Sequence, residues 1–264
     1  MFAYQASRGA VDVAFTDRHG GVSGGPYASL NLGDGGQDHR DTVAENIDLV
    51  ARSLAALAAR DDGTDPDRAS HLTSGAPLPV VVGMRQVHGA DVAVVGERAQ
   101  LGGKHDPVAD ALVTGLPGVV LMVRAADCVP VLLADVSRGV VGAVHSGRPG
   151  LVAGAVLAAV TALREQGAQE LVAWVGPHVC GSCYEVPQEM RAEVADVVPE
   201  SYAETSWGTP SLDIGAGVVA QLRAAGVDDV VVTGRCTRED EDLFSYRRQG
   251  PSSGRLGGLV WIRP

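Results

Sequence analysis

Short valine-rich runs alternate along the chain with longer segments whose apolar residues follow helical spacing. The short runs predict buried strands within residues 11–15, 78–88, 91–97, 111–115, 171–177, 228–234 and 256–264. Residues 118–136 and 139–147 are apolar over most of their length and predict two more buried strands. The pattern therefore predicts roughly eight to ten strands.

Four segments combine helical spacing with terminal signals. These predicted helices cover residues 41–57, 151–167, 186–198 and 212–226. Asp41 or Thr42 caps the first helix, Gly167 closes the second, Pro187 lies in the first turn of the third, and Ser211 caps the fourth. Because hairpin-like and helix-linked strands are mixed, we expect mixed sheets covered by helices.

Two long polar segments interrupt this pattern. Residues 16–38 are rich in Gly, Ser, Asn and Asp, and loops of this length are usually functional or disordered. Their embedded Ser-Leu-Asn-Leu predicts an ordered loop that packs on the core, with a plain surface turn as the alternative. Residues 59–77 predict a mobile loop and not a domain boundary, because no second compositional regime follows.

Composition and charge narrow the classes of function. The 264 residues carry a net charge of −11, which disfavours nucleic acids and anionic membranes as partners. The N-terminus has no secretory signal pattern, and every apolar run is shorter than a membrane span. Four cysteines in a chain of this size do not make a disulfide framework, so we expect a cytoplasmic protein. The oligomeric state stays open.

Three soft metal ligands lie at or just after consecutive apolar runs. His88 follows the run at 80–84, Cys128 lies between two apolar runs, and His145 ends the run at 139–144. Each alone is typical of a packed residue. Together they would give zinc three ligands and leave a fourth position for water or substrate, which is the catalytic pattern. Asp127 next to Cys128 needs a partner or a function, because burying an unpaired charge is costly.

Two further clusters admit alternatives. Cys180 and Cys183 form a C-x-x-C that would suit a redox pair or half of a structural zinc site, but no second C-x-x-C exists. We therefore favour a turn with incidental thiols. Arg247 and Arg248 lie in a C-terminal basic segment that suits phosphate or carboxylate, or alternatively pairs with the acidic run 239–242 on the surface.

Six ordered blocks carry a resemblance to a known family. They are FTDRHGGVSGGPYASLNLG, RQVHGADV, ADALVTGLPGVVLMVRAADCVPVLLAD, GAVHSGRPG, GPHVCGSCYEV and LFSYRRQGPSSGR. Together they resemble the laccase-domain family, also called the polyphenol oxidase family, whose members are described as multifunctional purine nucleoside phosphorylases. The resemblance implies an α+β fold, an α/β/β/α layered sandwich with mixed sheets in one domain over residues 1–264.

The resemblance also implies a zinc site at His88, Cys128 and His145. The implied reactions are phosphorolysis of adenosine, inosine, guanosine and S-methyl-5′-thioadenosine, and hydrolytic deamination of adenosine. The implied partners are purine nucleosides and phosphate. The family pattern VHAGWRG departs here to His145-Ser-Gly-Arg148-Pro149-Gly, which keeps the ligand and bears on substrate preference.

We assign roles to further residues on chemical grounds. Asp127 is the candidate for proton transfer or for orienting the metal ligands, and Gln86 for hydrogen bonding near the metal. The candidate substrate-binding residues are Arg18, Ser29, Asn31, Arg247 and Arg248. The alternatives are a copper-dependent polyphenol oxidase, a hydrolase that edits peptidoglycan precursors, and a zinc-stabilised regulatory module without catalysis.

Overall fold

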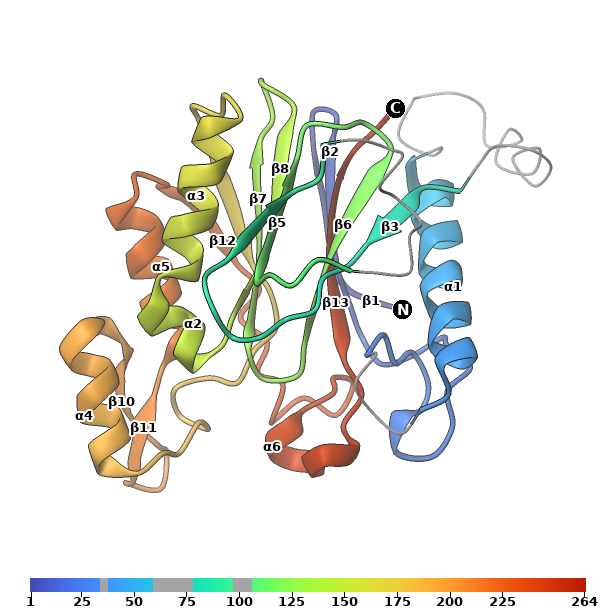
Figure 1. Ribbon diagram of the computed structural model, residues 1–264. Coiled ribbons are helices and arrows are strands. Elements are labelled where there is room, and N and C mark those ends of the chain that lie inside the picture. Colours follow the sequence, from blue (N-terminus) through green and yellow to red (C-terminus); the bar gives the residue numbers. More distant parts are fainter. Residues whose placement is uncertain (34–37, 59–77, 97–105) are drawn as a thin grey trace.

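Two β-sheets form the centre of the molecule (Figure 1). The computed structural model describes residues 1–33, 38–58, 78–96 and 106–264, so the predicted loop at 59–77 lies outside the described residues. The five-stranded sheet has the order β1 (Phe2–Arg8), β2 (Val11–Thr16), β13 (Leu256–Ile262), β6 (Val119–Ala125) and β3 (Val80–Val82). The six-stranded sheet has the order β12 (Asp229–Val232), β9 (Val172–Val175), β7 (Val129–Asp135), β8 (Val140–Ser146), β5 (Ala111–Thr114) and β4 (Val92–Val94).

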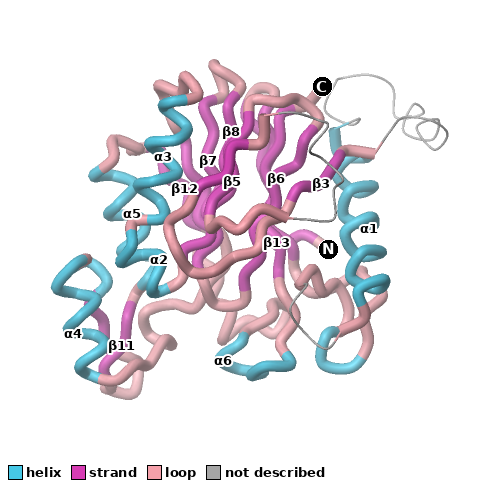
Figure 2. The backbone as a smooth tube through the Cα atoms, viewed as in Figure 1, coloured by secondary structure: helices cyan, strands magenta, loops and turns pink. Residues whose placement is uncertain are grey.

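Helices cover the outer face of each sheet, as Figures 1 and 2 show. Helix α1 (Arg40–Ala58) packs on the five-stranded sheet. The helices α2 (Arg148–Ala153), α3 (Ala155–Glu165), α4 (Gln188–Val197) and α5 (Ile214–Ala224) share a core with the six-stranded sheet. A hairpin of β10 (Tyr202–Glu204) and β11 (Pro210–Leu212) and the short helix α6 (Tyr246–Gln249) complete the described elements of regular structure besides 3₁₀ turns.

The alternation of apolar side chains explains this layering. In β6, Leu121 and Val123 face the core between the sheets, whereas Val120 and Met122 face α1. Both faces of each central strand are therefore buried, which is why these strands appear in the sequence as continuous apolar runs. The predicted α+β fold with mixed sheets and α/β/β/α layering is confirmed.

Two predicted elements are wrong in detail because the chain turns inside them. The apolar segment 118–136 forms two strands, β6 and β7, in different sheets, and the junction contains Asp127 at φ 90°. The predicted helix 151–167 is divided into α2 and α3 at Gly154, whose left-handed φ of 79° ends the first helix. The strands β1, β10 and β11 were not predicted.

The polar loop after β2 is ordered where it meets α1. Leu30 and Leu32 are fully buried in the core under α1, which confirms the predicted packing of Ser-Leu-Asn-Leu. Asn46 of α1 holds this loop, because its side-chain amide donates to Ser23 Oγ at 2.8 Å and to the Asn31 carbonyl at 2.9 Å. The loop is thereby fixed beside the end of β13.

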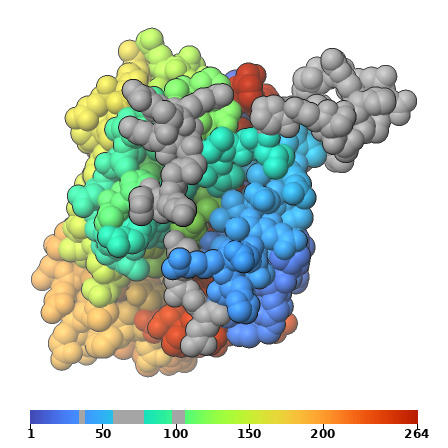
Figure 3. Space-filling view, turned by 45° about the vertical axis from the view of Figure 1, so that its right-hand side comes forward, coloured from blue at the N-terminus to red at the C-terminus, as the bar shows by residue number. Residues whose placement is uncertain are grey.

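The outer helix and the edge strand β3 form one continuous surface. In the space-filling view the teal residues of β3 border the blue residues of α1, and the two elements are in contact (Figure 3).

Across the described residues, each helix is too short or too polar to pass through a lipid bilayer.

Candidate metal centre and active site

His88, Cys128 and His145 meet at the end of the sandwich where β6 crosses into β7. One ligand atom from each lies within 4.8 Å of the other two. Cys128 Sγ is 3.8 Å from His88 Nε2, and the two imidazole rings lie edge to face with centroids 4.7 Å apart. A tetrahedral zinc ion with bonds of about 2.0 to 2.3 Å separates its ligands by roughly 3.3 to 3.8 Å, so the spacing fits.

Asp110 holds two of these ligands in place. It lies fully buried at the start of β5, directly across from His145 in β8, and its Oδ1 is 2.8 Å from His145 Nδ1. The backbone N–H groups of Val87, His88 and Gly89 also donate to its carboxylate, at 2.6 to 3.2 Å. Because the carboxylate accepts from Nδ1, His145 keeps Nε2 for a metal, which is the usual carboxylate–histidine–metal arrangement.

The same contacts shift the acidities of the site. Burial raises the pKa of the Cys128 thiol, but hydrogen bonds with His145 and His88 outweigh this and lower the pKa to about 6. Burial lowers the pKa of His145, whereas its bonds to Asp110 and Cys128 raise it to about 9. Burial raises the pKa of Asp110, but the bonds from His145 and the Gly89 N–H lower it below its usual value. The apoprotein thus favours thiolate, the form that binds metal.

Glycine and an unusual backbone make the close approach possible. A Cβ atom on Gly147 would lie 2.8 Å from His88 Cδ2 and 2.9 Å from Cys128 Sγ, so only glycine fits beside the ligands. His88 has φ 63° and Asp127 has φ 90°, which non-glycine residues rarely adopt. Such strain is typical of functional sites, and here the Asp110 carboxylate holds the His88 turn.

The ligands open onto a cavity of about 610 Å³, a size typical of small-molecule sites. Of the residues predicted from the sequence, the lining contains the following: Asn31, Gln86, His88, Asp127, Cys128, His145 and Arg247. It also contains five cationic or aromatic groups that were not among the predicted site residues: Arg85, Arg124, Tyr184, Tyr246 and Arg255. Arg255 and Ser253 of the C-terminal segment lie on the same wall.

The predicted polar residues at the cavity are fixed by contacts of their own. Both ends of the Gln86 side chain bond to the backbone of Arg124 at 2.8 Å, so Gln86 ties the His88 turn to β6. Asp127 accepts from Thr237 Oγ1 at 2.6 Å through Oδ1 and from the Arg247 backbone N–H at 2.6 Å through Oδ2. Asp127 therefore joins the β6–β7 junction to helix α6.

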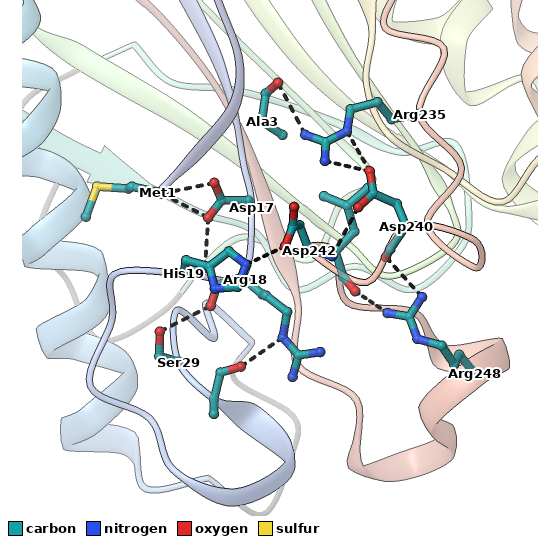
Figure 4. A network of polar contacts seen from close by, with 12 residues as sticks. Met1, Ala3, Asp17, Arg18, His19, Ser29, Arg235, Asp240, Asp242 and Arg248 are labelled. Atoms are coloured by element: carbon teal, nitrogen blue, oxygen red, sulfur yellow. Dashed lines mark hydrogen bonds and ion pairs between the residues drawn. The ribbon is translucent and has the colours of Figure 1, made fainter.

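Arg18, Ser29 and Arg248 are not among the cavity-lining residues. Figure 4 shows them in the polar network that joins the loop after β2 to the segment before α6. Arg18 donates to the Ala28 carbonyl, and Ser29 donates to the Arg18 carbonyl. Arg248 donates to several carbonyls of the preceding segment, those of Thr237 and Asp240 among them. These contacts stabilise the loop after β2 and the segment before α6.

Asp110 is the principal residue that sequence reasoning missed. It follows Ala109 at the start of an apolar run, and a carboxylate in such a run was a signal that we used for Asp127 but not here. Its importance depends on the pairing of β5 with β8, which brings residues 35 positions apart side by side. Sequence spacing alone does not specify that pairing.

The comparisons with known proteins cover nearly the whole chain. The family model described as multi-copper polyphenol oxidoreductase laccase matches residues 12–61 and 67–263. A purine nucleoside phosphorylase of Streptomyces coelicolor is 54% identical over 250 residues, 94% of either chain. A second one, from Streptomyces griseus, is 50% identical over 96% of this chain and 95% of its own. The crystal structure of YlmD from Geobacillus stearothermophilus has a TM-score of 0.83 at 29% identity, covering 100% of this chain and 99% of that one.

Proposed function

The chain belongs to the multi-copper polyphenol oxidoreductase laccase family, and from this premise we propose that it is a zinc-dependent purine nucleoside phosphorylase. The names of its Streptomyces relatives support the reaction. The observation that carries the proposal is the convergence of the three metal ligands and an arginine-rich wall on one cavity. A Lewis acid beside cationic side chains suits a reaction between a nucleoside and a phosphate ion.

The proposed substrates are adenosine, inosine, guanosine and S-methyl-5′-thioadenosine. In phosphorolysis a phosphate oxygen forms a bond to C1′ of the sugar while the bond from C1′ to the purine nitrogen breaks. The purine leaves with a proton, and the sugar 1-phosphate is the second product. We further propose that the same site deaminates adenosine, in which water replaces the 6-amino group and ammonia leaves.

The donor set fits zinc with one open position. Zinc bound by His88, Cys128 and His145 would supply Lewis-acid polarisation of a substrate oxygen or of water. Asp110 holds His145 in the tautomer that leaves Nε2 for the metal, and its bonds to the His88 turn fix the second imidazole. The low pKa of Cys128 keeps the third ligand ionised at neutral pH.

The cationic wall is the proposed phosphate site. Arg247 bonds to the Glu185 carbonyl at 2.9 Å, and its guanidinium lies 4.5 Å over the Tyr184 ring. Arg255 bonds to the carbonyls of Ser253 and Gly254 and stands near Tyr246. Both side chains are thus oriented before a ligand binds, which lowers the entropy cost of holding an anion.

The remaining cavity residues receive positioning and binding roles. The aromatic faces of Tyr184 and Tyr246 are suited to stacking against a purine. Asp127 holds the Arg247 backbone, and we retain it as the candidate for proton transfer to or from the substrate. Asn31 and Gln86 line the cavity, and we retain them as candidates for hydrogen bonds to the substrate and near the metal. We propose that Arg18, Ser29 and Arg248 act indirectly through the network of Figure 4.

A copper-dependent oxidase is the second candidate, because two imidazoles and one thiolate also suit Cu(II). Oxidases that reduce oxygen with several coupled coppers need clusters of many histidines. Among the described residues, two groups of side chains are close enough to share a metal ion: His88, Cys128 and His145, and a second group of three cysteines and Glu239. The only histidines in these two groups are His88 and His145. This ligand set favours zinc.

Product analysis tests the proposal directly. Purified wild-type protein with measured metal content is incubated with inosine or adenosine, with and without phosphate. We expect phosphate-dependent release of hypoxanthine or adenine, and no release by Cys128→Ala. Oxidation of a phenol by the copper-loaded protein without nucleoside turnover by the zinc-loaded protein would instead favour the oxidase.

A further inference from the structure

A second group of metal-ligand side chains lies outside the proposed active site. Cys180, Cys183, Cys236 and Glu239 present three sulfurs and one carboxylate oxygen, all within 4.8 Å of one another. Cys183 Sγ is 3.3 Å from Glu239 Oε1. In a tetrahedral zinc site the corresponding ligand separations are roughly 3.5 to 3.8 Å, so the four atoms are close enough to share one ion after small side-chain adjustments.

The two halves of this group have the same local construction. The first is C-x-x-C and the second, Cys236-Thr-Arg-Glu239, is C-x-x-E. Both fold as tight turns: Tyr184 N–H donates to the Cys180 carbonyl at 3.0 Å, and Asp240 N–H donates to the Cys236 carbonyl at 3.0 Å. Paired turns with two residues between ligands are how many structural zinc sites present their side chains.

Two strands bring the turns together. The first turn follows β9 and the second follows β12, and these strands are parallel neighbours in the six-stranded sheet. Cys236 continues the pairing through a bridge to His178. The sheet therefore places the two turns side by side, although 52 residues lie between Cys183 and Cys236 in the sequence.

The surroundings suit an anionic metal–thiolate centre. The Cys180 backbone N–H donates to Cys236 Sγ at 3.4 Å, the kind of bond that a ligating sulfur accepts. One Arg238 guanidinium nitrogen donates to the Cys183 carbonyl at 3.2 Å, which keeps a positive charge beside the first turn. Three thiolates and a carboxylate around a divalent zinc carry a net charge of −2, so a nearby cation stabilises the centre.

We propose that Cys180, Cys183, Cys236 and Glu239 bind a second zinc ion, which has a structural and not a catalytic role. Four protein ligands close the coordination shell and leave no position for substrate. The ion would join two turns. One carries Thr237, whose hydroxyl donates to Asp127, and the other precedes Tyr184 of the cavity wall. It thereby stabilises the part of the cavity wall that Thr237 bonds to the β6–β7 junction.

Metal counting on the full-length protein tests the proposal. The wild type, purified with zinc under anaerobic conditions and freed of loosely bound ions, should contain about two zinc ions per chain. Cys128→Ser and Cys236→Ser should each lose one ion, and the double variant should lose both. Ser182→Ala, an exposed residue of the first turn, is the matched control and should keep both ions. One zinc ion in the wild type, absent from Cys128→Ser and retained in Cys236→Ser, would overturn the proposal.

Cobalt spectra keep the test valid if Cys236→Ser does not fold. In Cys128→Ser the active-site sulfur is gone, so every thiolate-to-cobalt absorption band must come from the second site. We expect bands of tetrahedral cobalt with several thiolates, weakened in Cys128→Ser combined with Glu239→Gln. Absence of thiolate bands in Cys128→Ser would contradict the proposal.

Thiol counting separates zinc from a disulfide. After chelation and denaturation without reductant, the wild type should show all four of its cysteines as reactive thiols. In the native zinc-loaded protein, Cys180, Cys183 and Cys236 should resist alkylation until a chelator is added. Only two reactive thiols after denaturation would mean that two of the cysteines form a disulfide, and the zinc proposal would fall.

Discussion

The Asp110 carboxylate makes four close contacts with the residues of the proposed metal centre. Its Oδ1 accepts from His88 N–H at 2.9 Å and lies 2.8 Å from His145 Nδ1. Its Oδ2 accepts from Val87 N–H at 3.2 Å and Gly89 N–H at 2.6 Å. Asp110→Asn keeps the shape of the side chain but replaces one carboxylate oxygen with an NH₂ group. Each oxygen of Asp110 accepts from two donors, so in either orientation of the amide two of these donors face an NH₂ group that cannot accept.

The expected losses of stability and of zinc affinity in Asp110→Asn follow from these contacts. A hydrogen bond to a charged group contributes about 1.5 to 3 kcal/mol, so the loss of two predicts a loss of about 3 to 6 kcal/mol of unfolding free energy. For a chain of this size that corresponds to a melting temperature lower by roughly 10 °C. Removing the partner of a ligating histidine typically weakens zinc binding about 10- to 100-fold. Because the folded pKa of Asp110 is lowered, the stabilisation is present at neutral pH and fades as pH falls below the unfolded value.

Two measurements check this prediction. Zinc affinity is measured by competition with a chromophoric chelator at pH 7, and stability by urea unfolding of the metal-free protein. Asp91→Asn is the control, since Asp91 is an exposed carboxylate near the same turn. If Asp110→Asn matched Asp91→Asn within twofold in zinc affinity and within about 0.5 kcal/mol in stability, the role given to Asp110 would be refuted.

Three further predictions concern the room beside the metal ligands, the pH dependence of stability and the binding of phosphate. Gly147→Ala should weaken zinc binding at least about tenfold because the new methyl group meets the ligands, whereas Gly24→Ala, with nothing within 4 Å, should not. Asp135, fully buried, accepts several backbone N–H bonds; burial raises its pKa, but these bonds lower it to about 2. Asp135→Asn should therefore cost about 2 kcal/mol at neutral pH, and in urea unfolding the difference from wild type should vanish as pH falls from about 4 to 2. Arg247→Met should raise the KM for phosphate about 10- to 100-fold, and the exposed Arg223→Met should not; an equal KM in steady-state assays would remove Arg247 from the phosphate site.

Local patterns were sufficient to predict mixed sheets covered by helices and to select three candidate metal ligands, whereas the four-layer arrangement was implied by the family resemblance. Valine-rich runs buried on both faces identify the central strands, and His88, Cys128 and His145 were selected because each lies at the end of such a run. The division of the apolar segment 118–136 into two strands at Asp127 was not predictable in the same way. An apolar run gives no indication that its two halves belong to different sheets.

The contacts that sequence reasoning missed all depend on strand pairing. Asp110 meets His145 because β5 pairs with β8, and Cys236 meets Cys180 because β12 pairs with β9. The second turn is not recognisable as a C-x-x-C, because it has Glu239 at the position of the second cysteine of that motif. The tertiary fold, and not the spacing of residues, completes both sets of contacts.

The central claim is that the His88–Cys128–His145 centre carries phosphorolysis of purine nucleosides. The most direct test measures free purine and sugar 1-phosphate formed from inosine and phosphate by the zinc-loaded wild type and by Cys128→Ala. We expect the wild type to form equal amounts of the two products in a phosphate-dependent reaction, and Cys128→Ala to lose at least about 100-fold in rate. Unchanged turnover by a Cys128→Ala protein shown to lack zinc at this centre would contradict it.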